Sequence, residues 1–184
     1  MHGPHVESDG PANDLELLAD AAAGDAEAFG QLVERHGQRL YALAVSLVSS
    51  IPDAQDVLQE TFLGAFRGLS GFKGHASVRT WLTRILVTQA AKCLRDRQRR
   101  KKHETTGLPH GAVAAGKDFG HPLDVQAALA RLSSEHREVL VLREFEQLSY
   151  QEMSDVLGVP QGTIESRLHR AREALKQLLG AYRA

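Results

Sequence analysis

The feature that most constrains this chain is residues 148–172, where the signals for two helices and a tight turn between them follow in order. Ser149 and Glu152 have the spacing of a capping box, in which each side chain satisfies a free backbone N–H at a helix start. Gly158 can adopt the left-handed conformation that ends a helix, and Pro160 suits the first turn of the next one. Apolar residues recur between these signals at helical spacing, at Met153, Val156 and Leu157. The stretch is therefore predicted to be a helix-turn-helix.

The second helix of this pair has an apolar side and a polar side. Its apolar residues recur every three or four positions: Ile164, Leu168, Ala171, Leu175 and Leu178. Polar residues occupy the other side near its start: Gln161, Thr163, Ser166, Arg167 and Arg170. Arginine can bind the guanine edge in the major groove through two hydrogen bonds. A plain helical hairpin with a solvated basic side is the alternative, but the cap, turn and basic side together favour DNA binding.

The composition indicates an all-α protein. Apolar residues make up 42% of the 184-residue chain and aromatic residues only 5%, with many Leu and Ala. The single cysteine, Cys93, rules out an internal disulfide and suits a reducing compartment. No apolar run reaches the roughly 20 residues of a membrane helix, and the N-terminal segment lacks the regions of a signal peptide. We therefore expect a cytoplasmic protein without membrane insertion.

Charge is divided unevenly along the chain, although the formal net charge is only -1. Up to Glu60, Arg35 and Arg39 are the only Lys or Arg residues, against eleven Asp and Glu. Between Thr61 and Lys102 the proportion reverses, with eleven Lys and Arg and the single acid Asp96. This division predicts two partners of opposite electrostatic preference, with the basic part favouring phosphate.

Three helices and a loop are predicted before the basic part of the chain. Residues 1–13 have no apolar period and are expected to be a disordered tail. A helical pattern begins at Asp14, and Asp25 is a suitable N-cap for the second helix. Asp53 can cap a third helix, which runs from Ala54 to about Leu69. The loop that follows, residues 70–77, contains two glycines.

A long helix is predicted from Val78 to about Lys102, and it completes a first domain over residues 14–102. Its last two turns are dense in Lys and Arg. Cations near a helix C-terminus suit the helix dipole, but this number exceeds what the dipole requires. The excess indicates an electrostatic surface for nucleic acid.

A flexible linker and a second domain follow. Residues 103–121 are rich in Gly and lack an apolar period, and His103, His110 and His121 do not have metal-site spacing. In the second domain, residues 122–184, a helix from Pro122 to Arg131 precedes one from Glu135 to about Phe145, capped by Ser133 or Ser134. With the helix-turn-helix these make four helices. No catalytic constellation, phosphate loop or metal motif appears, so we expect neither an enzyme nor a cofactor.

This arrangement resembles the extracytoplasmic-function (ECF, group IV) sigma factors of bacterial RNA polymerase. Three segments carry the resemblance: residues 53–62 resemble region 2.2, residues 79–85 the helix beside the -10 element, and residues 160–172 the -35 recognition helix. The first domain would then be sigma region 2 and the second sigma region 4. The resemblance implies an alternative sigma factor, which binds core RNA polymerase, directs promoter-specific initiation and helps melt the -10 element.

The resemblance also implies partners. Asp53, Asp56 and Glu60 share one helix face, with Gln59 beside them, and would grip the clamp helices of the polymerase β′ subunit. The alternative is a row of solvated carboxylates with Asp53 as a cap. Region 4 would contact the β flap. Family members are commonly held by an anti-sigma factor, which makes such a protein a candidate partner.

The residues expected at the -10 element come from the loop and the long helix. The loop resembles the family's specificity loop, which receives a base flipped from the non-template strand. Phe72 is either part of this base site or a core residue, and Trp81 is expected in the core. Thr88 and Lys92 stand where the family often has Asn and Asp. The full -10 set is Phe72, Lys73, His75, Arg79, Arg84, Thr88, Lys92 and Arg95.

The residues expected at the -35 element lie on the second helix of the helix-turn-helix. Glu165 stands where a cation is common, and it would either repel phosphate or accept a hydrogen bond from cytosine. The base-facing position of His169 varies in the family, so the promoter sequence cannot be copied from relatives. The full -35 set is Gln161, Thr163, Glu165, Ser166, Arg167, His169 and Arg170.

Two other functions fit parts of the sequence. A helix-turn-helix regulator that acts without polymerase would use the C-terminal domain but leave the acidic face and the basic helix without a role. A helical adaptor would use the basic helix to bind acidic partners, and its binding would lack the steep salt dependence of duplex binding.

Overall fold

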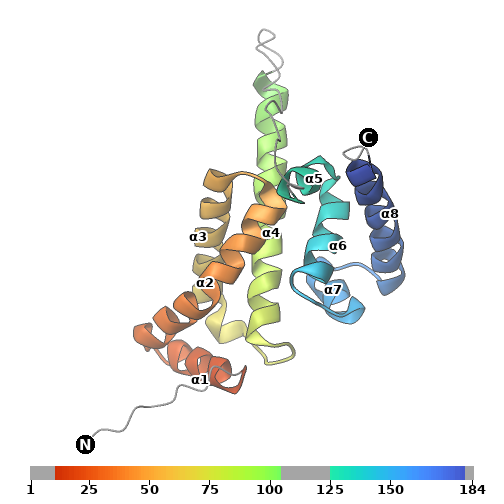
Figure 1. Ribbon diagram of the computed structural model, residues 1–184. Helices are drawn as coiled ribbons and strands as arrows, with labels where there is room; N and C mark the ends of the chain where they lie inside the picture. The colour runs from red at the N-terminus through yellow and green to blue at the C-terminus, as the bar shows by residue number, and fades with distance from the viewer. Residues whose placement is uncertain (1–10, 105–124, 181–184) are drawn as a thin grey trace, which may run out of the picture.

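The computed structural model describes residues 11–104 and 125–180, which form helices and no strand. The first bundle contains α1 (Pro11–Ala22), α2 (Ala26–Val48), α3 (Ile51–Gly68), a 3-10 turn, η1 (Leu69–Gly71), and α4 (Val78–Glu104). The second contains α5 (Val125–Arg131), α6 (Ser134–Glu144), α7 (Tyr150–Leu157) and α8 (Gln161–Gly180). The predicted all-α class is confirmed, and Figure 1 shows the two bundles side by side.

The first bundle is held together by the apolar faces of α2, α3 and α4, which pack against one another. Leu40 and Leu86 are fully buried at the centre, and Val57 of α3 is almost fully buried. Burying a side chain of this size stabilises the fold by about 1.5–3 kcal/mol. This packing fixes which faces of α3 and α4 are turned to solvent.

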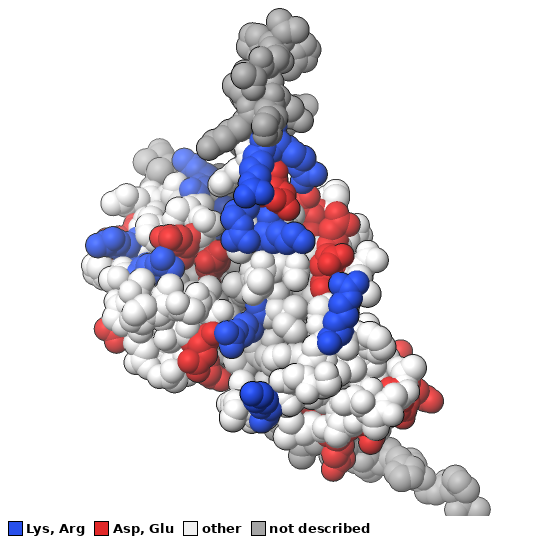
Figure 2. Space-filling view, turned by 180° about the vertical axis from the view of Figure 1, so that it is seen from behind, with Lys and Arg blue, Asp and Glu red and all other residues white. Residues whose placement is uncertain are grey.

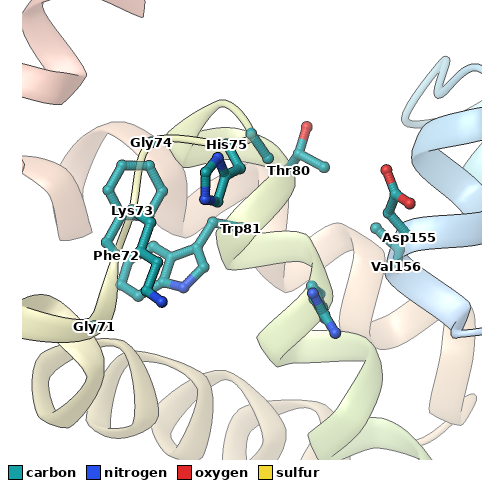
Figure 3. Close-up of a pocket in the computed structure, with 11 residues that line it drawn as sticks. Gly71, Phe72, Lys73, Gly74, His75, Thr80, Trp81, Asp155 and Val156 are labelled. Atoms are coloured by element: carbon teal, nitrogen blue, oxygen red, sulfur yellow. The ribbon is translucent and has the colours of Figure 1, made fainter.

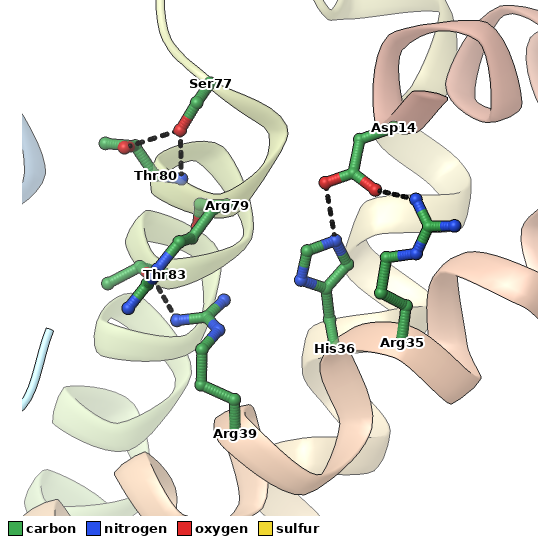
Figure 4. Close-up of polar contacts among 8 residues, drawn as sticks. All are labelled: Asp14, Arg35, His36, Arg39, Ser77, Arg79, Thr80 and Thr83. Atoms are coloured by element: carbon green, nitrogen blue, oxygen red, sulfur yellow. Dashed lines mark hydrogen bonds and ion pairs between the residues drawn. The ribbon is translucent and has the colours of Figure 1, made fainter. Parts of the chain in front are cut away.

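A buried polar cluster holds α1 on α2. Asp14 lies with one carboxylate oxygen 2.7 Å from Arg35 Nη1 and the other 3.0 Å from His36 Nε2 (Figure 4). Burial lowers the pKa of His36, although Asp14 opposes this shift. The helix begins at Pro11 rather than at Asp14, so residues 11–13 are helical and do not belong to the predicted tail. Residues 1–10 lie outside the described chain.

The predicted cap of the second helix is confirmed, but that of the third is wrong. Asp25 accepts hydrogen bonds from the backbone N–H groups of Glu27 and Ala28. The third helix is capped by Ser50, whose Oγ lies 3.4 Å from the backbone N of Asp53. Pro52 lies in the first turn of α3, where a missing N–H costs nothing, so the helix starts before Asp53.

The helix-turn-helix has the predicted local geometry. Ser149 and Glu152 form the capping box, and Gly158 ends α7 in the left-handed conformation with φ of 67°. Pro160 precedes α8, and its carbonyl accepts hydrogen bonds from the backbone N–H groups of Thr163 and Ile164. Of the two candidate caps for α6, Ser133 is the one that accepts the hydrogen bond.

The helix before the predicted linker extends into it by two residues. The helix α4 continues to Glu104, so His103 is helical rather than part of the linker predicted from that residue. His110 and His121 lie outside the described residues, as do the rest of residues 105–124. The chain is described again from Val125, the first residue of α5.

The two bundles pack against each other, which the sequence does not predict. The helix α2 contacts α5 and α6, and α4 contacts α7. Arg137 of α6 is buried and donates hydrogen bonds to the carbonyls of Leu47 in α2 (2.7 Å) and Leu129 in α5 (2.8 Å). The second bundle therefore supplies a donor to a carbonyl in the last turn of α2 that has no partner within its own helix.

The capping box makes a measurable contribution to stability. Replacing Ser149 with Ala should lower the free energy of unfolding by about 1 kcal/mol in urea titrations, because an N–H at the start of α7 loses its acceptor. The backbone and side-chain hydrogen bonds from Ser149 lower the pKa of Glu152. This contribution is present at neutral pH and is lost as pH falls through the lowered pKa, so Ser149→Ala should lose less stability on acidification than the wild type.

The control is Ser134→Ala, at an exposed position at the start of α6 where Ser133 is the cap. Equal losses in the two variants would contradict a specific role for the box.

Candidate nucleic-acid and protein-binding surfaces

An acidic row lies on the exposed side of α3. Asp56, Gln59 and Glu60 are exposed, as the sequence predicts for a docking surface. Asp53 differs from them, because its Oδ2 lies 3.5 Å from Arg97 Nη1 of α4 and its side chain is only 24% exposed. Of the four predicted residues, three are therefore turned to solvent and one is tied to its own bundle.

Two apolar side chains extend this row and were missed by sequence reasoning. Leu63 and Phe66 are 37% and 54% exposed, and they lie one or two helical turns beyond Asp56, Gln59 and Glu60 on the same face. The spacing of Phe66 is that of a core residue, and its ring packs edge to face with Phe29 at a centroid distance of 5.2 Å, yet the residue remains exposed. Exposed apolar groups beside carboxylates are typical of protein-binding surfaces. We call Asp56, Gln59, Glu60, Leu63 and Phe66 the α3 ridge.

A polar stripe runs along α4. Arg84, Thr88, Lys92 and Arg95 are all exposed and are spaced so that they share one face of the helix. We call these four residues the α4 stripe. Figure 2 shows Lys and Arg gathered toward the C-terminal end of α4. The predicted basic surface is thus turned to solvent along the described part of the helix.

The loop before α4 borders a cavity of about 260 Å³. Phe72 and Trp81 meet edge to face at one side of it, with ring centroids 5.2 Å apart, and Asp155 of α7 lies at the other side (Figure 3). Lys73 and His75 are exposed among the lining residues. Phe72 and Trp81 are half-buried and pack on the core while also lining the cavity, so the core and base-site interpretations are compatible for both residues.

Arg79 does not belong to the α4 stripe. It precedes Arg84 by five residues, which places it about 140° away around the helix. Its Nη2 lies 3.4 Å from Oε2 of Glu146, a buried residue of the second bundle. The structure therefore separates Arg79 from the other -10 candidates on α4.

The exposed side of α8 carries most of the predicted -35 residues. Glu165, Ser166, His169 and Arg170 are exposed. Arg167 is different, because its Nη2 lies 2.9 Å from Glu135 Oε1 of α6 and its side chain is 23% exposed.

The start of α8 is partly engaged as well. Gln161 donates a hydrogen bond to the side chain of Gln151 in α7, and Thr163 is half-buried. Arg170 is therefore the arginine of the predicted set that is most open to a nucleic acid groove.

Within residues 11–104 and 125–180, no helix combines the length and apolar character needed to cross a membrane. The same parts of the chain hold no group of three or more His, Cys, Asp or Glu side chains placed to bind a metal ion.

Comparison with known proteins agrees with this architecture. The family described as sigma-70 region 2 matches residues 32–100, and the family described as sigma-70 region 4 matches residues 123–175. The ECF sigma factor SigM of Mycobacterium tuberculosis is 39% identical over 170 residues, covering 91% of this chain and 85% of SigM. The sigma-H factor of Pseudomonas aeruginosa is 34% identical over 180 residues, covering 90% and 93%.

Two solved structures have similar folds. CnrH in complex with the cytosolic domain of CnrY has a TM-score of 0.69 and 33% identity, covering 92% of this chain and 98% of CnrH. RpoE in complex with the anti-sigma factor NepR from Bartonella quintana has a TM-score of 0.69 and 30% identity, covering 84% and 98%. The chain therefore belongs to the sigma-70 family, as an ECF sigma factor that directs transcription initiation and is not an enzyme.

Proposed function

We propose that three exposed surfaces of the chain each bind a different partner during transcription initiation. The α3 ridge binds the β′ clamp helices of core RNA polymerase, the α4 stripe and the loop before it bind the -10 element, and the exposed side of α8 reads the -35 element. The second bundle also contacts the β flap. The observation that carries this proposal is the placement of the ridge: α3 lies on the side of the first bundle away from α5–α8, so one chain can hold two partners at once (Figure 1).

The chemistry of each surface suits its proposed partner. Carboxylates beside exposed apolar groups on the α3 ridge fit a protein surface that offers both cations and apolar contacts. The α4 stripe presents cations along a helix, which favours a phosphate backbone. Aromatic rings in the loop cavity can stack with an unpaired base, and such stacking contributes about 1–3 kcal/mol per base.

We also propose an anti-sigma factor as a partner and the cytoplasm as the place of action. The solved relatives include one bound to the anti-sigma factor NepR and one bound to the cytosolic domain of CnrY. Core polymerase and promoter DNA are in the bacterial cytoplasm, so a protein that joins them acts there.

A helix-turn-helix regulator acting without polymerase is the second candidate. It gives no role to the α3 ridge, and it does not account for the match of residues 32–100 to sigma-70 region 2. Gel filtration with core polymerase separates the two functions, because only a sigma factor should elute with the enzyme.

The α3 ridge can be tested by reversing its charge. Asp56→Arg together with Glu60→Arg should abolish co-elution with core polymerase, because two favourable charge contacts become repulsive. Helix content, measured by circular dichroism, should not change, since both side chains are exposed. The matched control is Glu16→Arg with Asp20→Arg, an exposed pair on α1 that should retain binding. Retained binding by the ridge variant would contradict the assignment of the α3 ridge to core polymerase.

Sequence reading by α8 can be tested with a pair of arginines. Arg170→Ala should reduce discrimination between -35 sequences by about 1–3 kcal/mol in competition binding of the polymerase holoenzyme. Arg167→Ala should affect discrimination less, because that side chain is tied to Glu135. A uniform loss on all sequences for Arg170→Ala would make it a phosphate contact instead.

The loop cavity can be tested through Phe72. Phe72→Ala should slow promoter opening by holoenzyme more than it weakens duplex binding, because a melted base loses its aromatic neighbour. Permanganate footprinting and filter binding measure the two steps. Phe72→Tyr, which keeps the ring, is the control and should open promoters at nearly the wild-type rate. If opening by Phe72→Ala is unaltered, the ring is a core residue only.

A further inference from the structure

The side chain of Glu146 crosses from the second bundle into the first. It lies in the turn between α6 and α7, and only 3% of the side chain is exposed. Its Oε2 pairs with Arg39 Nη1 of α2 and lies 3.4 Å from Arg79 Nη2 of α4. A carboxylate buried to this extent is stable only with such partners, because desolvation of an unpaired charge is costly.

The turn that carries Glu146 is fixed by its own hydrogen bonds. The backbone N of Glu146 lies 3.3 Å from the carbonyl O of Val141, and Leu148 N lies 3.2 Å from Leu142 O. Gln147 has a positive φ of 57°, which is uncommon for a residue other than glycine. The backbone therefore holds the carboxylate in place against the first bundle.

Arg39 and Arg79 offer more hydrogen-bond donors than the carboxylate of Glu146 satisfies. Within the described chain, Arg39 Nε and Nη2 are buried and have no hydrogen-bond partner, while Nη1 also lies 3.2 Å from Thr83 Oγ1. Figure 4 shows Arg39 and Arg79 approaching each other beside Thr83. A phosphate group offers more acceptor oxygens than one carboxylate and is a preferred partner of arginine forks. The unpaired donors therefore suit a larger anion.

A second carboxylate of the second bundle lies at the loop cavity. Asp155 of α7 lines it together with cationic Lys73 and Arg84 of the first bundle (Figure 3). The second bundle thus presents acidic groups at two places where the first bundle presents cations. The helix α3 lies on the other side of α2 and α4 (Figure 1), and the side chains of the α3 ridge are exposed.

We propose that Glu146 is an internal stand-in for a DNA phosphate, which holds the second bundle against the first through the enclosed Arg39 and the half-exposed Arg79 until nucleic acid takes its place. This inference rests on the proposed function, because it assigns Arg39 and Arg79 to promoter DNA. In the closed form the α3 ridge is free, so core polymerase can bind before the bundles separate. DNA phosphate then replaces the carboxylate between the two arginines.

The test uses Glu146→Gln, which keeps the shape of the side chain and removes its charge. Trp81, the single tryptophan of the chain, reports opening because α7 lines the cavity next to it. Acrylamide quenching of Trp81 and the radius of gyration from X-ray scattering should both rise. Affinity for a short single-stranded DNA of random sequence should increase by up to about tenfold, as expected if about a tenth of the wild-type molecules are open.

Two further variants act as controls. Glu144→Gln removes an exposed carboxylate two residues away, which pairs with Arg172 inside the second bundle, and it should change none of the three measurements. Arg79→Gln should open the bundles but give a smaller gain in DNA affinity than Glu146→Gln, because it removes one of the cations proposed to receive the phosphate.

Each possible result for Glu146→Gln tests a different part of the proposal. Unchanged quenching and radius of gyration for Glu146→Gln, with wild-type helix content, would overturn the closed contact. Opening without tighter DNA binding would overturn the phosphate role. Neither result depends on core polymerase, whereas failure of the wild-type chain to support transcription with core polymerase would overturn the proposed function itself.

Discussion

The packing of α4 determines most of what this molecule can present to its partners. One side of the helix is buried against α2 and α3 through Leu82, Leu86 and Ala90. Because a helix has fixed angular spacing, this burial decides that Arg84, Thr88 and Arg95 point outward and that Arg79 points elsewhere. The loop cavity depends on the same packing, since Trp81 and Phe72 meet where α4 begins. Rotation of α4 about its own axis would change the exposure of all these side chains together.

Features set by neighbouring residues were predictable from the sequence. The capping box at Ser149 and Glu152, the left-handed Gly158 and the cap at Asp25 depend on spacings of a few residues and are confirmed. The third helix shows the limit of this reasoning. Ser50 and Asp53 are both good caps, and Ser50 is used because the helix can start around Pro52.

Features set by contacts between distant residues were not predictable. Glu146 pairs with Arg39, which is 107 positions away in the chain, and no periodicity connects the two residues. Arg167 illustrates the same point at the recognition helix. Its place on the polar side of α8 is readable from helical spacing, but its pairing with Glu135 depends on how α8 lies against α6. Phe66 has core-like spacing, yet it remains more than half exposed beside Phe29 of α2.

The closed arrangement does not affect all three binding surfaces equally. The helix α3 lies on the side of the first bundle away from the second (Figure 1), and the α3 ridge is exposed, as are Glu165, Ser166, His169 and Arg170 of α8. Arg39 and Arg79 are the cations that the second bundle engages directly. Polymerase docking and -35 recognition can therefore precede separation of the bundles, while replacement of Glu146 at Arg39 cannot. In the closed form Glu146 keeps DNA phosphate from the buried donors of Arg39, whereas the α4 stripe stays exposed.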